Sequence, residues 1–234
     1  MAEALIEVRG LVNRFGAQVV HDHLDMTVER GEVFGIVGGS GSGKSVLLRS
    51  ILGLQRPRAG EVRMLGRDLT QLSTPALKEI KATYGVTFQQ GALFSSLTVL
   101  QNVQLPMLEH LHLSPRALDE LALLKVRLVG LTDEAARKFP AQLSGGMVKR
   151  AALARALALD PQLLMDLRQQ LGLTVIMITH DLDTIFRTCN RVGVIIDRKM
   201  TSDTLEAITR NPHPWIQAYF HGERAQRFGQ GKEH

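Results

Sequence analysis

The most informative run in this 234-residue chain is Gly38-Gly39-Ser40-Gly41-Ser42-Gly43-Lys44-Ser45. It follows the G-x-x-x-x-G-K-S pattern of a phosphate loop, in which glycines let backbone N–H groups close around phosphate oxygens. Residues 33–37 before it are apolar on both faces, as in a buried parallel strand. Residues 44–54 after it carry apolar side chains at helical spacing. A strand, a glycine loop and a helix in this order predict a nucleotide site within an α/β fold.

Two side chains of the loop have predicted chemical roles. Lys44 is expected to reach the β- and γ-phosphates of ATP, and the Ser45 hydroxyl is expected to ligate Mg²⁺. The N-terminus of the following helix adds partial positive charge. The alternative, a glycine-rich turn without function, is disfavoured because the strand and the helix are both present.

Composition limits the remaining classes. The hydrophobic share of 44% is ample for a buried core, and the single cysteine, Cys189, excludes an internal disulfide framework. The N-terminus lacks the build of a signal peptide, and no apolar stretch approaches the ~20 residues of a membrane span. The net charge of +5 is scattered. A solvated surface explains this charge best and an anionic membrane face second, while nucleic acid is disfavoured because no aromatic-basic platform accompanies it.

Strand and helix patterns surround the loop. Short strands are predicted at residues 6–8, 19–20, 24–28 and 61–65. From about residue 89 to 158 the pattern is mostly helical, with one helix of roughly fifteen residues after Ser114-Pro115 and another from about Gly145 to Asp160-Pro161. Strand patterns return at residues 174–179 and 192–196. One α/β core with a helical insertion is therefore expected.

Four further motifs follow in an order that resembles one family. They are the run Leu143-Ser144-Gly145-Gly146-Met147 before a helix rich in alanine and arginine, the pair Phe88-Gln89, the triplet Thr179-His180-Asp181, and Phe15 before the first tight turn. By itself Phe15 fits ordinary core equally well, and a histidine at a strand end is more often structural. Together with the phosphate loop, the motifs resemble the ATP-binding subunits of ABC transporters.

The resemblance implies roles for these residues. Ser144, Gly145 and Gly146 would point at the γ-phosphate held by the loop of a second ATPase subunit in a homodimer. Gln89 would contact Mg²⁺ and couple to the membrane subunit, and His180 would contact the γ-phosphate, so that both are candidate catalytic residues. Phe15 would lie under the adenine ring.

The resemblance also implies a domain organisation. A single P-loop NTPase domain, the ABC cassette, would span residues 1–234. Within it, a RecA-like core sheet and an N-terminal antiparallel β subdomain would take residues 1–88 and 159–212, a helical subdomain 89–158, and a helical tail 213–234. In that tail a helix over residues 214–227 places Trp215, Ile216, Tyr219 and Phe220 close to one face. Packing on its own domain and reaching a second ATPase subunit both remain open for this helix.

Three stretches are similar to ATPases of Mla-type, MCE-associated transporters. They are the run at residues 143–147, which is the signature of the ABC family and here ends in Met147, residues 91–99, and the tail from His213 to Gly222. Those systems move phospholipids between the inner and outer membranes of Gram-negative bacteria. The similarity implies a membrane-embedded permease and an MCE-type lipid-binding protein as partners, no nucleic acid, and a peripheral location on the cytoplasmic face of the inner membrane.

One expected segment is missing. In the family, the helix after the signature is followed by a strand ending in Asp-Glu and then by a loop of the form S-G-L-D, called the D-loop. Here Asp166 is followed by Leu167, and the sequence contains no D-loop. Asp166 also comes one residue early, and a one-residue slip on a strand turns a side chain to the other face. If residues 162–165 and 174–179 are parallel neighbours, the eight residues between them are too few for the crossover of about a dozen or more that parallel strands need.

A deletion of roughly two dozen residues is therefore expected at the junction of Met165 and Asp166. Three origins of this deletion are open: a natural deletion, an engineered one, or an error in the sequence. ATP hydrolysis needs a group that positions the attacking water beside the γ-phosphate. Without the glutamate, we expect ATP binding to persist and turnover to fall severely.

Three functional hypotheses follow. The first is an ABC ATPase subunit of a phospholipid transporter that carries the deletion. The second is a regulatory module that binds ATP without hydrolysing it. The third, a soluble ABC protein of DNA repair or translation, is disfavoured because such proteins usually carry tandem cassettes or coiled-coil insertions.

Overall fold

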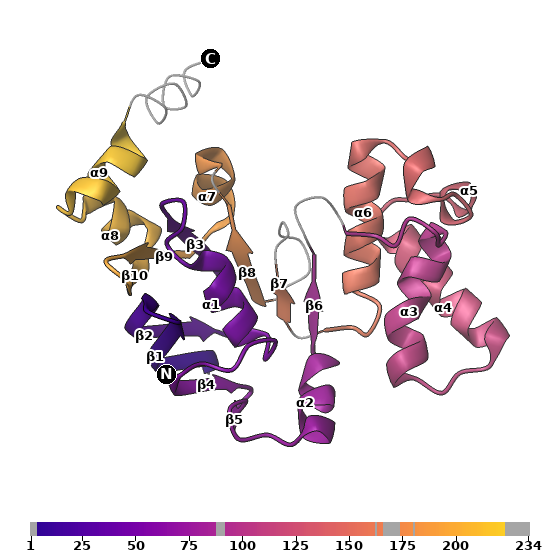
Figure 1. Ribbon diagram of the computed structural model, residues 1–234. Coiled ribbons are helices and arrows are strands. Elements are labelled where there is room, and N and C mark those ends of the chain that lie inside the picture. The colour runs from indigo at the N-terminus through magenta and orange to yellow at the C-terminus, as the bar shows by residue number, and fades with distance from the viewer. Residues whose placement is uncertain (1–3, 88–91, 162, 166–173, 180, 223–234) are drawn as a thin grey trace, which may run out of the picture. The chain divides into compact units, whose positions relative to one another are not determined.

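The computed structural model describes residues 4–87, 92–161, 163–165, 174–179 and 181–222, and forms two compact units (Figure 1). The first unit comprises Met1–Leu77 with Arg168–His234, and the second comprises Lys78–Leu167. Strands and helices occur in both, which confirms the predicted α/β class. Over the part of the chain that is described, no helix is both long and apolar enough to cross a bilayer.

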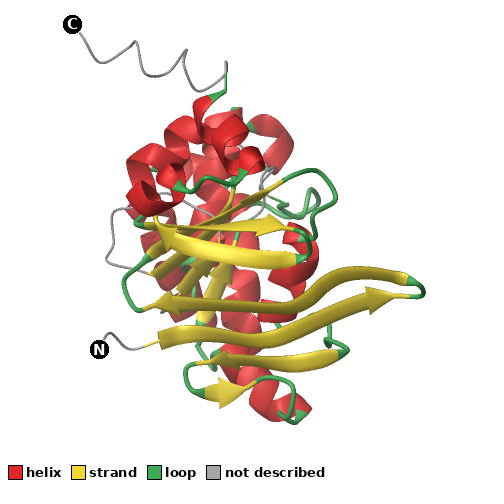
Figure 2. Ribbon diagram, turned by 90° about the vertical axis from the view of Figure 1, so that its left-hand side faces the viewer, coloured by secondary structure: helices red, strands yellow, loops and turns green. Residues whose placement is uncertain are grey.

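The first sheet of unit 1 is antiparallel and has the order β2-β1-β4-β5. Its strands are β1 (Ala4–Phe15), β2 (Gln18–Glu29), β4 (Ala59–Met64) and β5 (Arg67–Asp68). The long β1–β2 hairpin is prominent in Figure 2. In β2, the buried residues Leu24, Met26 and Val28 alternate with exposed ones, the pattern of a half-buried strand.

The prediction of two separate strands at residues 19–20 and 24–28 is wrong, because β2 runs without interruption. The polar stretch His21-Asp22-His23 between them resembles a turn in the sequence. Pairing with β1 carries the strand through it, and the left-handed φ of +51° at His23 coincides with an irregular register. Long-range pairing thus overrides the local preference.

The second sheet of unit 1 is built around β3 (Val33–Gly38), all of whose residues are buried. Parallel neighbours flank it on both sides, β8 (Thr174–Ile178) and β9 (Arg191–Ile196), and β10 (Lys199–Thr204) pairs antiparallel with β9. The predicted buried parallel strand is thereby confirmed. The carboxyl ends of β3, β8 and β9 consequently meet at one edge, where α/β sheets place their ligands.

The helices of unit 1 include the one that follows the phosphate loop. This helix, α1 (Lys44–Ile51), buries Leu47 and Ile51 completely. It ends three residues before the predicted boundary of 54, because Gly53 adopts a left-handed φ of +61°. The other helices are α7 (Leu182–Thr188), α8 (Leu205–Arg210) and α9 (Pro214–His221), and α2 (Thr74–Lys81) contains the boundary with unit 2.

Unit 2 is mainly helical over its described residues, as predicted. Its helices are α3 (Val99–His110), α4 (Pro115–Leu128), α5 (Asp133–Ala136), the 3₁₀ turn η1 (Pro140–Gln142) and α6 (Gly145–Ala156). Small side chains on α6, Ala151 and Ala154, meet Val103 and Met107 of α3 in one core. Helix α6 ends before the predicted Asp160-Pro161, where Asp160 takes a left-handed φ of +50°.

Unit 2 also contains two short parallel strands, β6 (Tyr84–Val86) and β7 (Leu163–Met165). The sequence does not predict β6. A Cβ at Gly85 would lie 2.2 Å from the carbonyl oxygen of Ala156, so this strand needs glycine to pass the end of α6. Strand β7 agrees with the predicted strand at 162–165. Asp166, Leu167 and the rest of the short connection lie outside the described residues.

Candidate functional site

The phosphate loop joins β3 to α1, as the motif predicts. Gly41 and Gly43 take φ values of +78° and +97°, which side chains other than glycine rarely adopt. The Lys44 ammonium donates hydrogen bonds to the carbonyl oxygens of Gly38 and Gly39, each at 2.8 Å. Burial lowers the pKa of Lys44. The two hydrogen bonds hold the ammonium against the loop, where it can neutralise phosphate.

The rest of the loop is open to a ligand. Gly41 and Ser45 are exposed, and a Cβ built at Gly41 meets no atom within 4 Å. The first turn of α1 contains no acidic residue that would oppose an anion at its N-terminus. These features fit the phosphates of a nucleotide, with the Ser45 hydroxyl available to a metal ion.

A buried polar group supports the loop from behind. His21 of β2 is fully buried, and its Nδ1 lies 3.1 Å from the Asn13 side-chain amide, which also donates to Ser50 of α1. The pKa of His21 is lowered to about 4, chiefly by burial, against a smaller opposing effect of the Gly43 backbone. His21 Nε2 meets no partner in hydrogen-bond geometry among the described atoms. The imidazole is therefore neutral at pH 7, directly beneath Gly43.

A cavity of about 400 Å³ borders the loop in the same unit. Its walls are the start of β2, the phosphate loop at Gly41 and Ser42, and the β9–β10 turn at Asp197 and Arg198. Phe15 lies at the tip of the adjoining β1–β2 hairpin with 49% of its surface exposed. This exposure argues against Phe15 as ordinary core and leaves its ring accessible to a stacking partner.

Further groups lie at the same edge of the second sheet. Asp181 follows β8 and caps α7, accepting the backbone N–H of Thr184 at 3.3 Å. Asp197 and Arg198 follow β9 in a turn where both take left-handed φ values. Sequence reasoning did not single out this turn, nor His21, because neither belongs to a recognisable motif. The predicted His180 lies outside the described residues.

The signature run lies in unit 2, at the start of α6. Ser144 is the N-cap, and its hydroxyl accepts a hydrogen bond from the Met147 N–H at 3.3 Å. Gly145 and Gly146 are exposed with open space where side chains would be, and the first turn carries no acidic residue. This geometry offers an anion several backbone N–H groups. Phe88 and Gln89, which precede this helix in sequence, lie outside the described residues.

Comparison with known proteins identifies relatives over almost the whole chain. The family model described as ABC transporter matches residues 21–166. The intermembrane phospholipid transport system ATP-binding protein MlaF of Haemophilus influenzae is 35% identical over 245 residues, covering 95% of this chain and 92% of that protein. The probable ribonucleotide transport ATP-binding protein mkl of Mycobacterium tuberculosis is 33% identical over 250 residues, covering 97% of this chain and 69% of that protein.

Among solved structures, the dimeric post-hydrolysis state of the ATP-binding cassette MJ0796, bound to ADP and Pi, superposes with a TM-score of 0.74. It is 27% identical, and the match covers 86% of this chain and 98% of that one. The alignments with MlaF and mkl, at 245 and 250 residues, are longer than the 234 residues of this chain. Both relatives therefore contain positions that this chain lacks.

Proposed function

Because this chain belongs to the ABC transporter family as an ATP-binding subunit, we propose that it serves a transporter of phospholipids between membranes. The observation that carries the choice of substrate is the match to MlaF over 92% of that protein's length. The protein mkl, whose name refers to ribonucleotides, is matched over 69% of its length. An end-to-end match favours the phospholipid system.

Each part of bound ATP would meet its own group of residues. The loop amides and Lys44 hold the β- and γ-phosphates, with Gly41 and Gly43 providing the backbone conformation that the cradle needs. Phe15 offers its exposed ring to the adenine, and the cavity bounded by Asp197 and Arg198 adjoins the nucleoside. When bound, Mg²⁺ would neutralise phosphate charge, held by the Ser45 hydroxyl with Gln89 as a second ligand.

The signature run supports assembly as a homodimer. In unit 2, Ser144, Gly145 and Gly146 leave the N-terminus of α6 uncovered within the described part of the chain. A bare helix N-terminus favours an anion, and the γ-phosphate held by a second copy's loop is the anion we propose. His180 would contact the same phosphate from the copy that holds the nucleotide.

Hydrolysis is a separate question from binding. The family match ends at residue 166, where the expected Asp-Glu pair and D-loop are missing from the sequence. The longer alignments of MlaF and mkl agree with a deletion. This observation favours a second candidate function, a nucleotide-binding subunit that does not turn over.

Two measurements separate these candidates. The protein purified from its own host should have an intact mass near 25.8 kDa if the shorter chain is real; a mass larger by a few kilodaltons would show that the sequence has lost a segment. Phosphate release by the 234-residue chain should be far slower than by a variant with a family-type segment inserted after Met165. Equal rates would refute the requirement for that segment.

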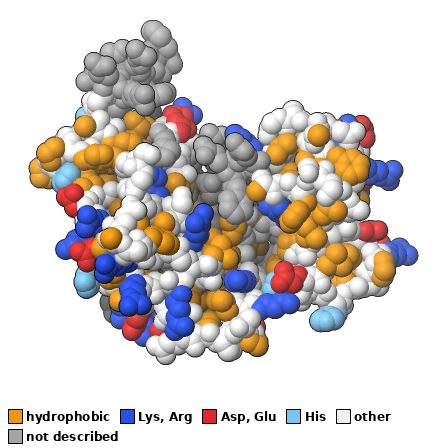
Figure 3. Space-filling model, in the orientation of Figure 1, with side chains coloured by type: hydrophobic (Ala, Val, Ile, Leu, Met, Phe, Trp, Pro, Cys, Tyr) orange, Lys and Arg blue, Asp and Glu red, His pale blue; other side chains and the backbone are white. Residues whose placement is uncertain are grey.

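A surface of unit 2 suits the membrane partner. A cavity of about 720 Å³ there is lined by Phe94, Leu105, Pro106 and Leu108 among others. Phe94 and Leu108 are 57% and 63% exposed, and hydrophobic side chains gather on this unit in Figure 3. A hollow edged by exposed apolar side chains fits a helix of the permease, which would hold the chain peripherally at the cytoplasmic face of the inner membrane.

The permease contact can be tested by co-purification from the native host. Leu108→Glu places a charge at the cavity and should abolish recovery of the permease. The matched control is Leu124→Glu, since Leu124 on α4 is similarly exposed, at 57%, but does not line the cavity. Recovery of the permease with both variants would refute this docking surface.

The substrate is tested with the complex that co-purifies, including the MCE-type protein that we expect in it. Reconstituted between donor and acceptor vesicles, it should move a fluorescent phospholipid faster with ATP than without, when the ATPase carries the restored segment. A labelled ribonucleotide should not be transported under the same conditions. The opposite result would assign the chain to the second substrate class.

A further inference from the structure

The C-terminal helix α9 is part of unit 1 and packs close to the phosphate loop. Its residues Ile216 and Phe220 are 1% and 2% exposed, so the helix is firmly buried along one side. The Phe220 ring meets Phe186 of α7 edge to face, with 6.0 Å between ring centroids. Over its described residues, the aromatic helix thus packs on its own unit.

Trp215 of α9 lies beside the loop itself. Its indole Nε1 is 3.9 Å from the place a Cβ on Gly39 would occupy. The carbonyl of Gly39 accepts one of the two hydrogen bonds from Lys44. Trp215 also stacks on Tyr219, with ring centroids 4.9 Å apart and an interplanar angle of 12°. The indole that lies next to Gly39 is thus the same one that stacks on Tyr219.

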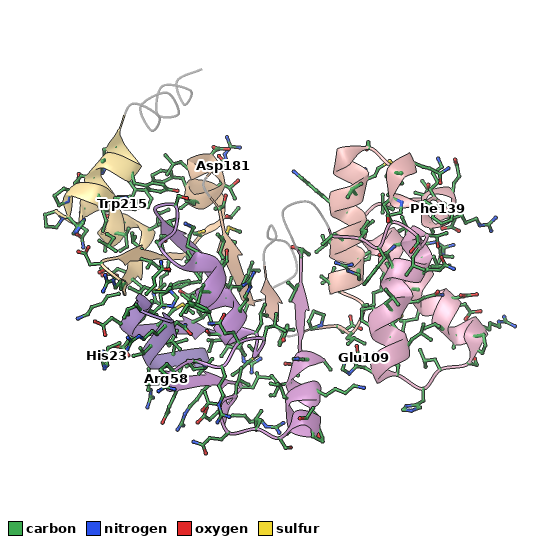
Figure 4. The ribbon with its side chains drawn as sticks, viewed as in Figure 1. His23, Arg58, Glu109, Phe139, Asp181 and Trp215 are labelled. Carbon is green, nitrogen blue, oxygen red and sulfur yellow. The ribbon has the colours of Figure 1, made fainter. Side chains whose placement is uncertain are left out.

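The Tyr219 hydroxyl is buried, and no described group accepts or donates a hydrogen bond to it. The pKa of Tyr219 is raised to about 12, first by burial and then by the negative charge of Asp181. Asp181 begins α7, the helix that Phe220 contacts, and Figure 4 shows Asp181 and Trp215 at the same end of unit 1. A buried hydroxyl without a partner costs stability, and a hydrogen bond to an acceptor in another state of the protein would remove that cost.

We propose that Trp215 and Tyr219 are positioning residues of the nucleotide site, through which α9 couples the phosphate loop to the start of α7. When nucleotide phosphates displace Lys44 from Gly39, the loop and the indole shift together. The stacked Tyr219 ring follows, and its hydroxyl donates a hydrogen bond to the Asp181 carboxylate. This inference rests on the nucleotide site of the proposed function, and it gives the C-terminal helix a role in nucleotide binding.

The full-length chain provides its own probe, because Trp215 is its one tryptophan. Titration with MgATP should change the Trp215 emission with the same Kd that calorimetry gives. Tyr219→Phe should weaken MgATP binding about tenfold, the scale of one lost hydrogen bond to a charged group, and should shrink the emission change. Its melting temperature should stay the same or rise, because the variant removes a hydroxyl that is unpaired without nucleotide.

The matched control is Tyr84→Phe, the same change at the chain's other tyrosine, which lies in unit 2. It should leave MgATP affinity and the Trp215 response unchanged. Calorimetric binding without any change in Trp215 emission would overturn the inference, and so would wild-type affinity in Tyr219→Phe. Failure of the wild-type chain to bind MgATP by calorimetry would instead refute the nucleotide site, and the inference with it.

Discussion

Gly43→Ala should destabilise the protein strongly, for two reasons that add. At φ +97° an alanine is strained, which costs ~1–2 kcal/mol for the left-handed region. Its Cβ would also lie 2.5 Å from both His21 Nε2 and Val20 Cγ1. Val20 is stiff at χ1 and His21 is held by Asn13, so neither moves easily, and overpacking of this kind costs ~1–3 kcal/mol. We expect a loss of about 2–5 kcal/mol in the free energy of unfolding.

The matched control is Gly41→Ala in the same loop. Gly41 has a similar φ of +78°, but a Cβ there meets nothing within 4 Å. Only the conformational cost applies, so we expect a loss of about 1–2 kcal/mol. The difference between the two variants isolates the contact with His21 and Val20.

The assay is urea denaturation of both variants and the wild type, followed by far-UV circular dichroism. At an unchanged m value, the shift in midpoint reports the change in stability. In a double-mutant cycle, His21→Ala should recover part of the loss in Gly43→Ala and none of the loss in Gly41→Ala. Equal destabilisation by the two glycine variants would refute the steric reasoning.

Three further outcomes are expected. Phe15→Ala should weaken ATP binding about tenfold, as for loss of one aromatic stacking contact, whereas Phe15→Tyr should bind normally; calorimetry with equal affinities for all three chains would remove Phe15 from the site. The pKa of His21 falls from 6.5 to about 4 on folding. As the pH is lowered, the unfolded chain therefore protonates His21 at a higher pH than the folded chain does. Stability should therefore be lost as the pH falls from about 6.5 to about 4, by up to about 3 kcal/mol; His21→Gln should reduce this dependence in urea titrations, and an unchanged slope would contradict it. Burial raises the pKa of Cys189 to about 11, so a thiol reagent at pH 8 should label it slowly in the native protein and rapidly in urea; rapid native labelling would show that the thiol is accessible.

Features encoded in consecutive residues could be predicted from the sequence alone. A phosphate loop needs its glycines, its lysine and a flanking strand and helix, all of which lie within residues 33–51, so local patterns suffice. The same holds for Ser114 and Ser144, whose side chains cap the helices that directly follow them. The missing Asp-Glu pair is likewise a property of the sequence alone.

Features that depend on residues far apart in the chain become visible only in the folded structure. The continuity of β2 through its polar centre comes from pairing with β1, and β6 needs Gly85 because Ala156 passes so close. The positions of His21 behind Gly43 and of Trp215 beside Gly39 follow from packing between elements, which periodicity cannot encode. A motif identifies the atoms that meet the nucleotide. The side chains that hold those atoms in place are brought to them only by the folded core.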